Sequence, residues 1–260
     1  MMTQETYPMF TTARALALST SLAALCAAPA LGFDLSNMSD AERSAFRAEI
    51  RAYLMDNPQV ILEAVQSLEE RQAAEQAAAE VNLIADNAEA IFNDGFSWIG
   101  GNPDGDITIV EFMDYRCGYC RKAHADVAKL LDFDGNIRLI VKEFPILGED
   151  SLASSKFAIA IKQLHGDEAY GAVHEELITM RGSANEPALA KVAKNAGLDH
   201  KEILAKMESE EVLAEIRATR ALAETLQIRG TPTFVLEDEL LRGYVPFDGM
   251  LAMVEQIRAE

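Results

Sequence analysis

The sequence is poor in cysteine and in positive charge. It has three cysteines in 260 residues, too few for a small scaffold held together by disulfide bonds. Lysine and arginine number 23 against 42 aspartates and glutamates, which gives a net charge of −19. We expect no binding to nucleic acid or to an anionic membrane surface, because both would repel so acidic a protein. The remaining composition, 49% hydrophobic and 25% charged, is typical of a globular protein with one or two domains.

A long hydrophobic run is also lacking near the N-terminus. The apolar stretch at residues 15–28 is shorter than the roughly 20 residues that a membrane-spanning helix needs, so we expect no membrane insertion. Arg14 precedes this stretch and Ala28-Pro29-Ala30 ends it, which is the pattern of a cleaved secretory signal. We therefore predict a signal peptide over residues 1–30 and a periplasmic location.

Residues 31–93 are predicted to form a helical module and linker that precede a second domain. Ser39 and Glu42 have the spacing of a capping box, the signature of a helix N-terminus. Narrow apolar stripes at helical spacing follow: Phe46, Ile50, Tyr53 and Leu54, then Ile61, Val65 and Leu68. Such stripes pack either on the following domain or on copies of themselves. We favour self-association and expect a homo-oligomer.

Residues 94–260 alternate between strand and helix patterns, which predicts an α/β fold. Residues 107–112 and 137–144 are β-rich and almost continuously apolar, and a helical pattern lies between them. A strand, a helix and a second strand form a βαβ unit, so these two strands should be parallel. Residues 145–230 show helical stripes without a convincing strand and are predicted to be a helical insertion. A hairpin and a closing helix complete the pattern: 233–236, 240–245 and 247–258.

Signal cleavage removes Cys26 and leaves two cysteines, both in the sequence Cys117-Gly118-Tyr119-Cys120. This sequence follows a predicted strand and opens a helix, where free backbone N–H groups and the helix dipole stabilise a thiolate. Two intervening residues place Cys120 one turn further inside, close enough to bond to Cys117. We therefore predict a redox pair in which Cys117 attacks a disulfide and Cys120 resolves the mixed disulfide.

Other uses of this cysteine pair fit less well. A zinc site needs four ligands, and His124 could add only one. Haem attachment needs a histidine directly after the second cysteine, where Arg121 stands. A structural disulfide that closes so short a loop gains little entropy. We expect no metal and no cofactor, and we predict that the four histidines are surface residues: His124, His165, His174 and His200.

Two segments resemble the DsbA-type thiol:disulfide oxidoreductases. Residues 110–120, VEFMDYRCGYC, are similar to the active-site segment of that family, and residues 230–234, GTPTF, to its cis-proline loop. A helical insertion between the two motifs is characteristic of the family as well. The resemblance covers about residues 97–260 and implies a thioredoxin-like fold with an inserted helical domain, here preceded by an α-helical N-terminal stalk.

The resemblance also implies roles for individual residues. Pro232 should be cis and lie opposite Cys117, and Thr231 should offer its backbone to a client; Gly118 and Tyr119 are the other predicted substrate-binding residues. Tyr119 stands where strongly oxidising members have histidine, which implies a less oxidising disulfide.

Glu111 matches the buried acid of the family, and its implied role is to take up protons during thiol exchange. The alternative is an acid at the edge of the sheet. Lys142 is a candidate partner on the adjacent strand. Strand alternation places Lys142 and Glu143 on opposite faces, without deciding which face each takes.

Residues 34–72 resemble the N-terminal module of ScsC (suppressor of copper sensitivity) proteins, and members with this module are trimers with disulfide isomerase activity. We therefore expect a trimeric, periplasmic isomerase that acts on cysteine-containing client proteins and exchanges electrons with a membrane thiol reductase or oxidase. Three alternatives remain open: a monomeric dithiol oxidase, a Cu(I)-binding copper-tolerance protein, since two thiolates can take Cu(I), and a folding chaperone without redox activity.

Overall fold

The computed structural model describes residues 37–259. The predicted signal peptide therefore lies outside the described residues. Within 37–259, no helix combines the length and the apolar character that crossing a membrane requires. The chain divides into two units, residues 1–68 and 69–260.

The described part of the first unit is helical. Helix α1 (Asp40–Asp56) begins with the predicted capping box, in which Ser39 accepts a hydrogen bond from the Glu42 backbone and the Glu42 carboxylate accepts one from the Ser39 backbone. None of the residues of α1 is buried. Helix α2 (Gln59–Asp86) starts in this unit and continues into the second one. The two helices confirm the helical pattern predicted for this part of the chain.

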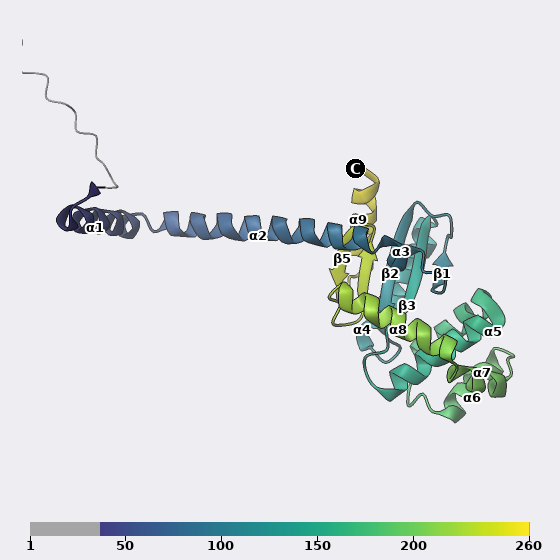
Figure 1. The fold of residues 1–260 in the computed structure, drawn as a ribbon. Coiled ribbons are helices and arrows are strands. Elements are labelled where there is room, and N and C mark those ends of the chain that lie inside the picture. The colour runs from purple at the N-terminus through teal and green to yellow at the C-terminus, as the bar shows by residue number, and fades with distance from the viewer. Residues whose placement is uncertain (1–36, 260) are drawn as a thin grey trace, which may run out of the picture. The chain divides into compact units, whose positions relative to one another are not determined.

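The second unit is built on a five-stranded sheet (Figure 1). The strand order is β1-β3-β2-β4-β5, and the bounds are β1 Trp98–Gly101, β2 Ile107–Met113, β3 Ile137–Glu143, β4 Thr233–Leu236 and β5 Glu239–Arg242. Strands β2 and β3 are parallel, as predicted from the βαβ pattern, and the other neighbours are antiparallel. The prediction missed β1, because a four-residue strand with two glycines has no recognisable alternation.

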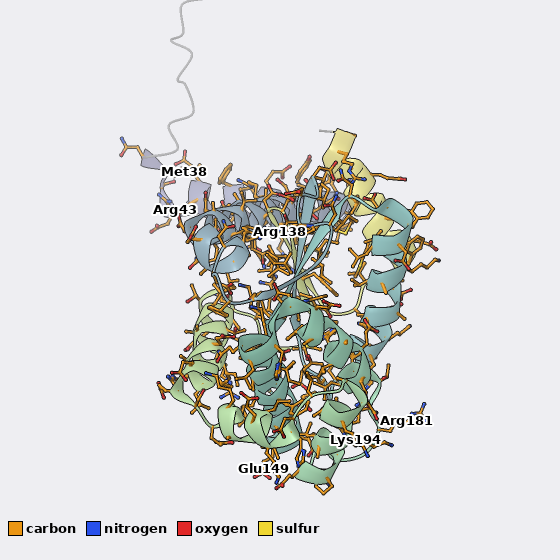
Figure 2. All side chains as sticks on the ribbon, turned by 90° about the vertical axis from the view of Figure 1, so that its right-hand side faces the viewer. Met38, Arg43, Arg138, Glu149, Arg181 and Lys194 are labelled. Carbon is orange, nitrogen blue, oxygen red and sulfur yellow. The ribbon has the colours of Figure 1, made fainter. Side chains whose placement is uncertain are left out.

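The remaining helices are α3 Ala88–Phe92, α4 Gly118–Asp134, α5 Glu149–Thr179, α6 Glu186–Asn195, α7 His200–Met207, α8 Glu210–Thr225 and α9 Phe247–Ala259. Residues 145–230 contain no strand, which confirms the predicted helical insertion. Helix α5 is kinked at Gly166, whose φ of 84° is a conformation that glycine adopts at little cost. Figure 2 shows the side chains of sheet and helices filling the interior of this unit, while Arg181 and Lys194 of the insertion project outward.

The two faces of the sheet bury different sets of side chains. Residues 107, 109 and 113 of β2 pack with α4, α5 and α9 on one face. Residues 110 and 112 pack with α3, α8 and the end of α2 on the other. Glu111 lies two residues from Ile109 and two from Met113, so it is on the same face of the strand as they are. It therefore faces the cysteine-bearing helix α4.

The expected pairing of Lys142 with Glu111 is wrong, because the two side chains lie on opposite faces of the sheet. Lys142 faces α3, where its Nζ donates to the Ala90 carbonyl oxygen at 2.8 Å and to Asp94 Oδ2 at 2.5 Å. Its side chain is 1% exposed. The next residue, Glu143, faces α4 and α5 instead.

Candidate active site around Cys117 and Pro232

Cys117 is the N-cap of α4, directly after the loop that leaves β2. It is 7% exposed, while Cys120, one turn inside the helix, is fully buried. Both are free thiols, and Cys117 Sγ donates to the carbonyl oxygen of Thr231 at 3.1 Å. The structure therefore brings together the cysteine motif and the proline loop, which are more than 100 residues apart in sequence.

The proline loop is held firmly beside this sulfur. The Thr231–Pro232 peptide bond is cis, as the family resemblance implies. The hydroxyl of Thr233 donates to the Gly230 carbonyl at 2.9 Å, and the N–H of Gly243 donates to the Pro232 carbonyl at 3.0 Å. These bonds fix the backbone of the loop at the point where Thr231 meets Cys117.

An open hollow of about 530 Å³ adjoins the proline loop. Its lining consists of polar and small residues: Gln76, Gln227, Arg229, Gly230, Thr231, Pro232, Thr233, Arg242 and Gly243. Arg242 is paired with Glu80 at 2.8 Å. A peptide segment lying along residues 230–232 would have room for polar side chains here.

Tyr119, between the two cysteines, forms an exposed aromatic surface. Its side chain is 65% exposed and stacks on Tyr244, with ring centroids 6.5 Å apart. Tyr244 is held in turn by a hydrogen bond from its hydroxyl to Asp126 and by Lys122, whose Nζ lies 4.2 Å above its ring. At Gly118, an added Cβ would meet nothing within 4 Å, so the backbone here is open to a ligand.

Glu111 is buried beneath the cysteines, at 4% exposure, so the alternative of an acid at the sheet edge is excluded. Burial, together with the charge of Glu143, raises the pKa of Glu111 to about 8. Burial also raises the pKa of the Cys120 thiol strongly, and the nearby charge of Glu111 adds to this effect. A thiol with a raised pKa becomes a thiolate only when a nearby group takes its proton, and Glu111 is a carboxyl group close to Cys120 whose pKa lies near neutral pH.

Asp114 is a residue that the sequence reasoning missed. It is fully buried. Its Oδ1 accepts from the Arg116 backbone at 2.8 Å, and its Oδ2 accepts from the N–H groups of Ile146 and Leu147 at 2.8 and 3.0 Å. Asp114 thus ties the loop before Cys117 to the loop after β3. The short-range part of this pattern, an Asp whose side chain bonds the backbone two residues on, is a recognisable turn signal.

The prediction that all four histidines are surface residues is wrong for His174, which is 4% exposed. Its ring stacks on Tyr170 with centroids 5.7 Å apart, and its Nδ1 lies 3.0 Å from the Tyr115 hydroxyl. Burial lowers the pKa of His174 to about 3, so the ring is neutral at physiological pH. Helical spacing carried a signal for this burial, because His174 lies next to Val173 and four residues after Tyr170, on the same helical face as Leu177 and Ile178.

Residues 37–259 contain no group of three or more His, Cys, Asp and Glu side chains arranged to hold a metal ion. The arrangement that they do contain is a helix N-terminal CxxC facing a cis-proline at the edge of a central sheet. This combination defines the thioredoxin-like class of proteins.

The comparison with protein families makes this assignment specific. The thioredoxin family matches residues 93–256, more than half of the chain, and the protein belongs to that family. Residues 42–75 match the copper resistance protein ScsC N-terminal domain. The fold class predicted from the sequence, including the helical N-terminal region, is confirmed.

Solved structures of similar fold include oxidoreductases. A thioredoxin-like oxidoreductase from Silicibacter pomeroyi DSS-3 is 42% identical, with a TM-score of 0.62, over 66% of this chain and 98% of that one. The thiol-disulfide exchange protein alpha-DsbA2 of Wolbachia pipientis is 25% identical, with a TM-score of 0.66, over 70% and 98%. A linker-deletion mutant of Proteus mirabilis ScsC shares the fold over 87% of this chain and 99% of that one, at 23% identity and a TM-score of 0.64.

The curated relatives that the chain matches are much longer proteins. The Na(+)/H(+) antiporter NhaA 1 of Salinispora arenicola is 24% identical over 157 residues, which is 60% of this chain and 24% of that protein. The chain thus spans about a quarter of the length of these relatives.

Proposed function

We propose that this protein is a periplasmic thiol:disulfide interchange protein that acts as a disulfide isomerase on misoxidised client proteins. The observation that carries the proposal is the Cys117 sulfur, placed at the N-terminus of α4 and 3.1 Å from the carbonyl oxygen that precedes the cis-proline. An attacking thiolate at this position is stabilised by the helix dipole, and a client backbone can pair with Thr231.

The exchange begins when the Cys117 thiolate attacks one sulfur of a client disulfide. The client S–S bond breaks, its other sulfur leaves as a thiolate, and a mixed disulfide joins Cys117 to the client. In isomerisation, another client thiolate then attacks the bonded client sulfur, which re-forms a client disulfide and releases Cys117 with no net oxidation.

Cys120 releases the client from the mixed disulfide when no client thiolate attacks it. Its proton passes to the Glu111 carboxylate, its sulfur attacks Cys117, and the client leaves as a thiolate while a Cys117–Cys120 disulfide forms. The client has then been reduced by two electrons. A membrane thiol reductase must return two electrons to the pair before the next cycle, so we propose such a partner.

Oligomerisation supports the isomerase assignment over the oxidase alternative. The match of residues 42–75 to the ScsC N-terminal domain, together with exposed apolar side chains in this part of the chain, supports self-association. Several Cys117 sites around one client raise the effective concentration of thiolate for repeated attack. We propose a trimer as the functional assembly.

The test combines a trapping experiment with an activity assay on the mature chain. The Cys120→Ser variant should accumulate mixed disulfides with client proteins, because Cys117 attacks but is not resolved, and the Cys117→Ser variant should trap none. The wild-type protein should restore activity to scrambled ribonuclease in the presence of a reducing buffer. Absence of trapping in Cys120→Ser would refute interchange chemistry. Trapping without rescue of scrambled ribonuclease, in a monomer, would favour the oxidase.

A further inference from the structure

Glu143, at the end of β3, is a buried ionisable residue that the exchange chemistry above does not use. It is 6% exposed and follows the alternation of Leu139 and Val141, so it faces the same side of the sheet as Glu111. A carboxylate in such a place persists only where hydrogen bonds replace the lost water.

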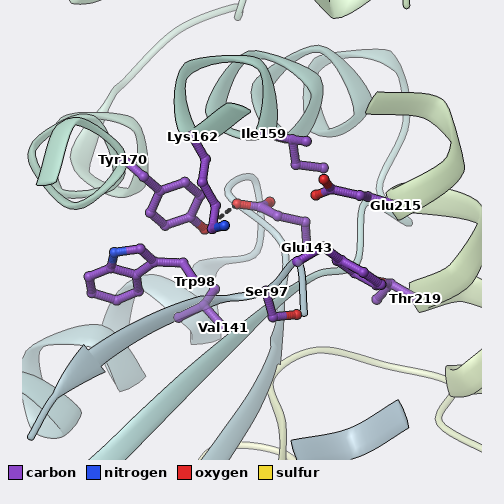
Figure 3. Close-up of a pocket in the computed structure, with 10 residues that line it drawn as sticks. Ser97, Trp98, Val141, Glu143, Ile159, Lys162, Tyr170, Glu215 and Thr219 are labelled. Atoms are coloured by element: carbon purple, nitrogen blue, oxygen red, sulfur yellow. Dashed lines mark hydrogen bonds between the residues drawn. The ribbon is translucent and has the colours of Figure 1, made fainter. Parts of the chain in front are cut away.

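Three hydroxyl groups supply these hydrogen bonds. Tyr115 and Tyr170 donate to Glu143 Oε1 at 2.8 and 2.5 Å, and Ser155 donates to Oε2 at 2.7 Å. Figure 3 shows the Tyr170 hydroxyl directed at the Glu143 carboxylate inside a small pocket. Donors of this kind favour the ionised form of a carboxyl group. Because Tyr115 lies two residues before Cys117, the same bonds connect α5 to the active-site loop.

Glu111 and Glu143 are near neighbours on adjacent strands. Glu111 is paired with Val141 in the β2–β3 register, and Glu143 is the next residue of β3 on the same face. Burial raises the pKa of Glu143 to about 7, while its three hydroxyl donors lower it, and the charge of Glu143 contributes to the raised pKa of Glu111. The three hydroxyl donors favour the charged form of Glu143, and that charge makes ionisation of Glu111 harder.

Other charged and titratable groups face this pair from each packed element. They are Asp114 in the loop after β2, Cys120 in α4, Lys162 and His174 in α5, and Glu215 in α8. Lys162 is paired with Asp167 at 3.4 Å, and the Glu215 carboxylate accepts from Gln163 Nε2 at 2.6 Å. Neither makes a hydrogen bond to Glu143, whose bonds come from the three hydroxyls.

We propose that Glu143 is a positioning residue for disulfide exchange: its hydroxyl-bound carboxylate holds the proton on Glu111 and so sets the pH at which Glu111 exchanges a proton with Cys120. When Cys120 attacks the mixed disulfide, its S–H proton moves to the Glu111 carboxylate, the Cys117–Cys120 bond forms and the client leaves as a thiolate. In the reverse direction, Glu111 returns the proton. The kinetic part of this proposal rests on the proposed function, and the titration of Glu111 does not.

The test measures the titration of the Glu111 carboxyl carbon by NMR in the full mature chain labelled at glutamate, with Glu111→Gln to assign the signal. Glu143→Gln keeps the size of the side chain and removes its charge. The Glu111 midpoint should move to lower pH by about one unit, the size of effect that a close like charge has. The pH profile for Cys120 attack on a preformed Cys117–peptide mixed disulfide should shift in the same direction.

Two further variants make the result specific. Tyr170→Phe removes one donor but keeps Glu143, and should shift the Glu111 midpoint in the same direction by a smaller amount. Glu215→Gln removes another acid, a partly buried one that lines the same pocket, and should leave the midpoint unchanged. An unchanged midpoint in both Glu143→Gln and Tyr170→Phe, or an equal shift in Glu215→Gln, overturns the proposal. If Glu143→Gln does not fold, the proposal is tested by comparing the Glu111 midpoint in Tyr170→Phe with that in Glu215→Gln. A shifted midpoint in a chain without interchange activity would instead refute the proposed function and leave the role of Glu143 intact.

Discussion

At the scale of single residues, burial decides how the ionisable groups of the site behave. Glu111 has a pKa of about 8 in the folded protein, against an ordinary value of 4.5. The folded chain therefore binds this proton more tightly than the unfolded chain does. The associated stability is fully present below pH 4.5 and is lost as the pH rises to above 8, because the folded protein must then carry a buried charge.

Replacing Glu111 by glutamine should remove this pH dependence, because glutamine does not ionise. At pH 9 the Glu111→Gln variant should be more stable than the wild type by a few kcal/mol, since each pKa unit corresponds to about 1.4 kcal/mol. At pH 5 the two should be nearly equal, because both side chains are then neutral. Urea denaturation at the two pH values measures the difference. The same variant should slow resolution of the mixed disulfide by about 100-fold at neutral pH. A stability difference that does not change with pH would show that Glu111 does not ionise in this range.

At the scale of structural elements, one buried ion pair fastens the segment between α3 and β1 onto the sheet. The Lys142 ammonium group of β3 donates to both Asp94 and the carbonyl oxygen of Ala90, which lies within α3. Asp94 also accepts hydrogen bonds from the Ser97 backbone and hydroxyl, at 2.9 and 2.7 Å. The bonds to Lys142 lower the pKa of Asp94 despite its burial. The edge strand β1 thus depends on a charge on its neighbouring strand.

Removing the Asp94 carboxylate from the pair with Lys142 should strongly destabilise the folded protein. Asp94→Ala leaves the Lys142 ammonium buried without a counter-ion and should lower the free energy of unfolding by about 3–5 kcal/mol. The matched control is Arg217→Gln, which breaks the exposed pair with Glu210 in α8 and should cost less than about 1 kcal/mol. Chemical denaturation of both variants measures the contrast. Equal effects would mean that the buried pair contributes no more than a surface pair.

At the scale of the whole molecule, exposed apolar surface is concentrated in one stretch of chain. Among the residues that the structure describes, thirteen large hydrophobic side chains are exposed, and eight of them lie between residues 46 and 68. Folded monomers rarely leave so many large apolar side chains in water, and such surfaces usually mark an interface. This distribution supports the proposed oligomer.

A charge on the apolar stripe of α2 should dissociate that oligomer. Val65→Glu should reduce the solution mass to that of a single chain and abolish isomerase activity, because a charge within an apolar interface would have to be desolvated. Trapping of clients by the Cys120→Ser variant should persist in the Val65→Glu background. Glu63→Lys, an exposed change on the opposite side of the same helix, should leave mass and activity unchanged. Multi-angle light scattering and the scrambled-ribonuclease assay give both readouts. A Val65→Glu protein of unchanged mass would contradict the proposal.

Much of the fold could be predicted because its signals are local. The apolar runs of β2 and β3, the CxxC at the start of α4 and the capping box at Ser39 each specify a structure through nearest neighbours or helical spacing. The cis bond at Pro232 and the meeting of its loop with Cys117 followed from family resemblance rather than from these patterns. Strand β1 was not predicted, since its pairing with β3 and not its own sequence makes it a strand.

The sequence by itself determined which chemical groups the protein has and the periodicity with which they occur. Lys142 and Glu143 must face opposite sides of the sheet, for example, whatever the fold. Only the tertiary structure decided which side faces α4, and so made Glu143 rather than Lys142 the neighbour of Glu111. The N–H groups of Ile146 and Leu147 that donate to Asp114 were brought to it in the same way. Solvent exclusion and long-range hydrogen bonds depend on elements that are far apart in the chain, and no local pattern records which of them will pack together.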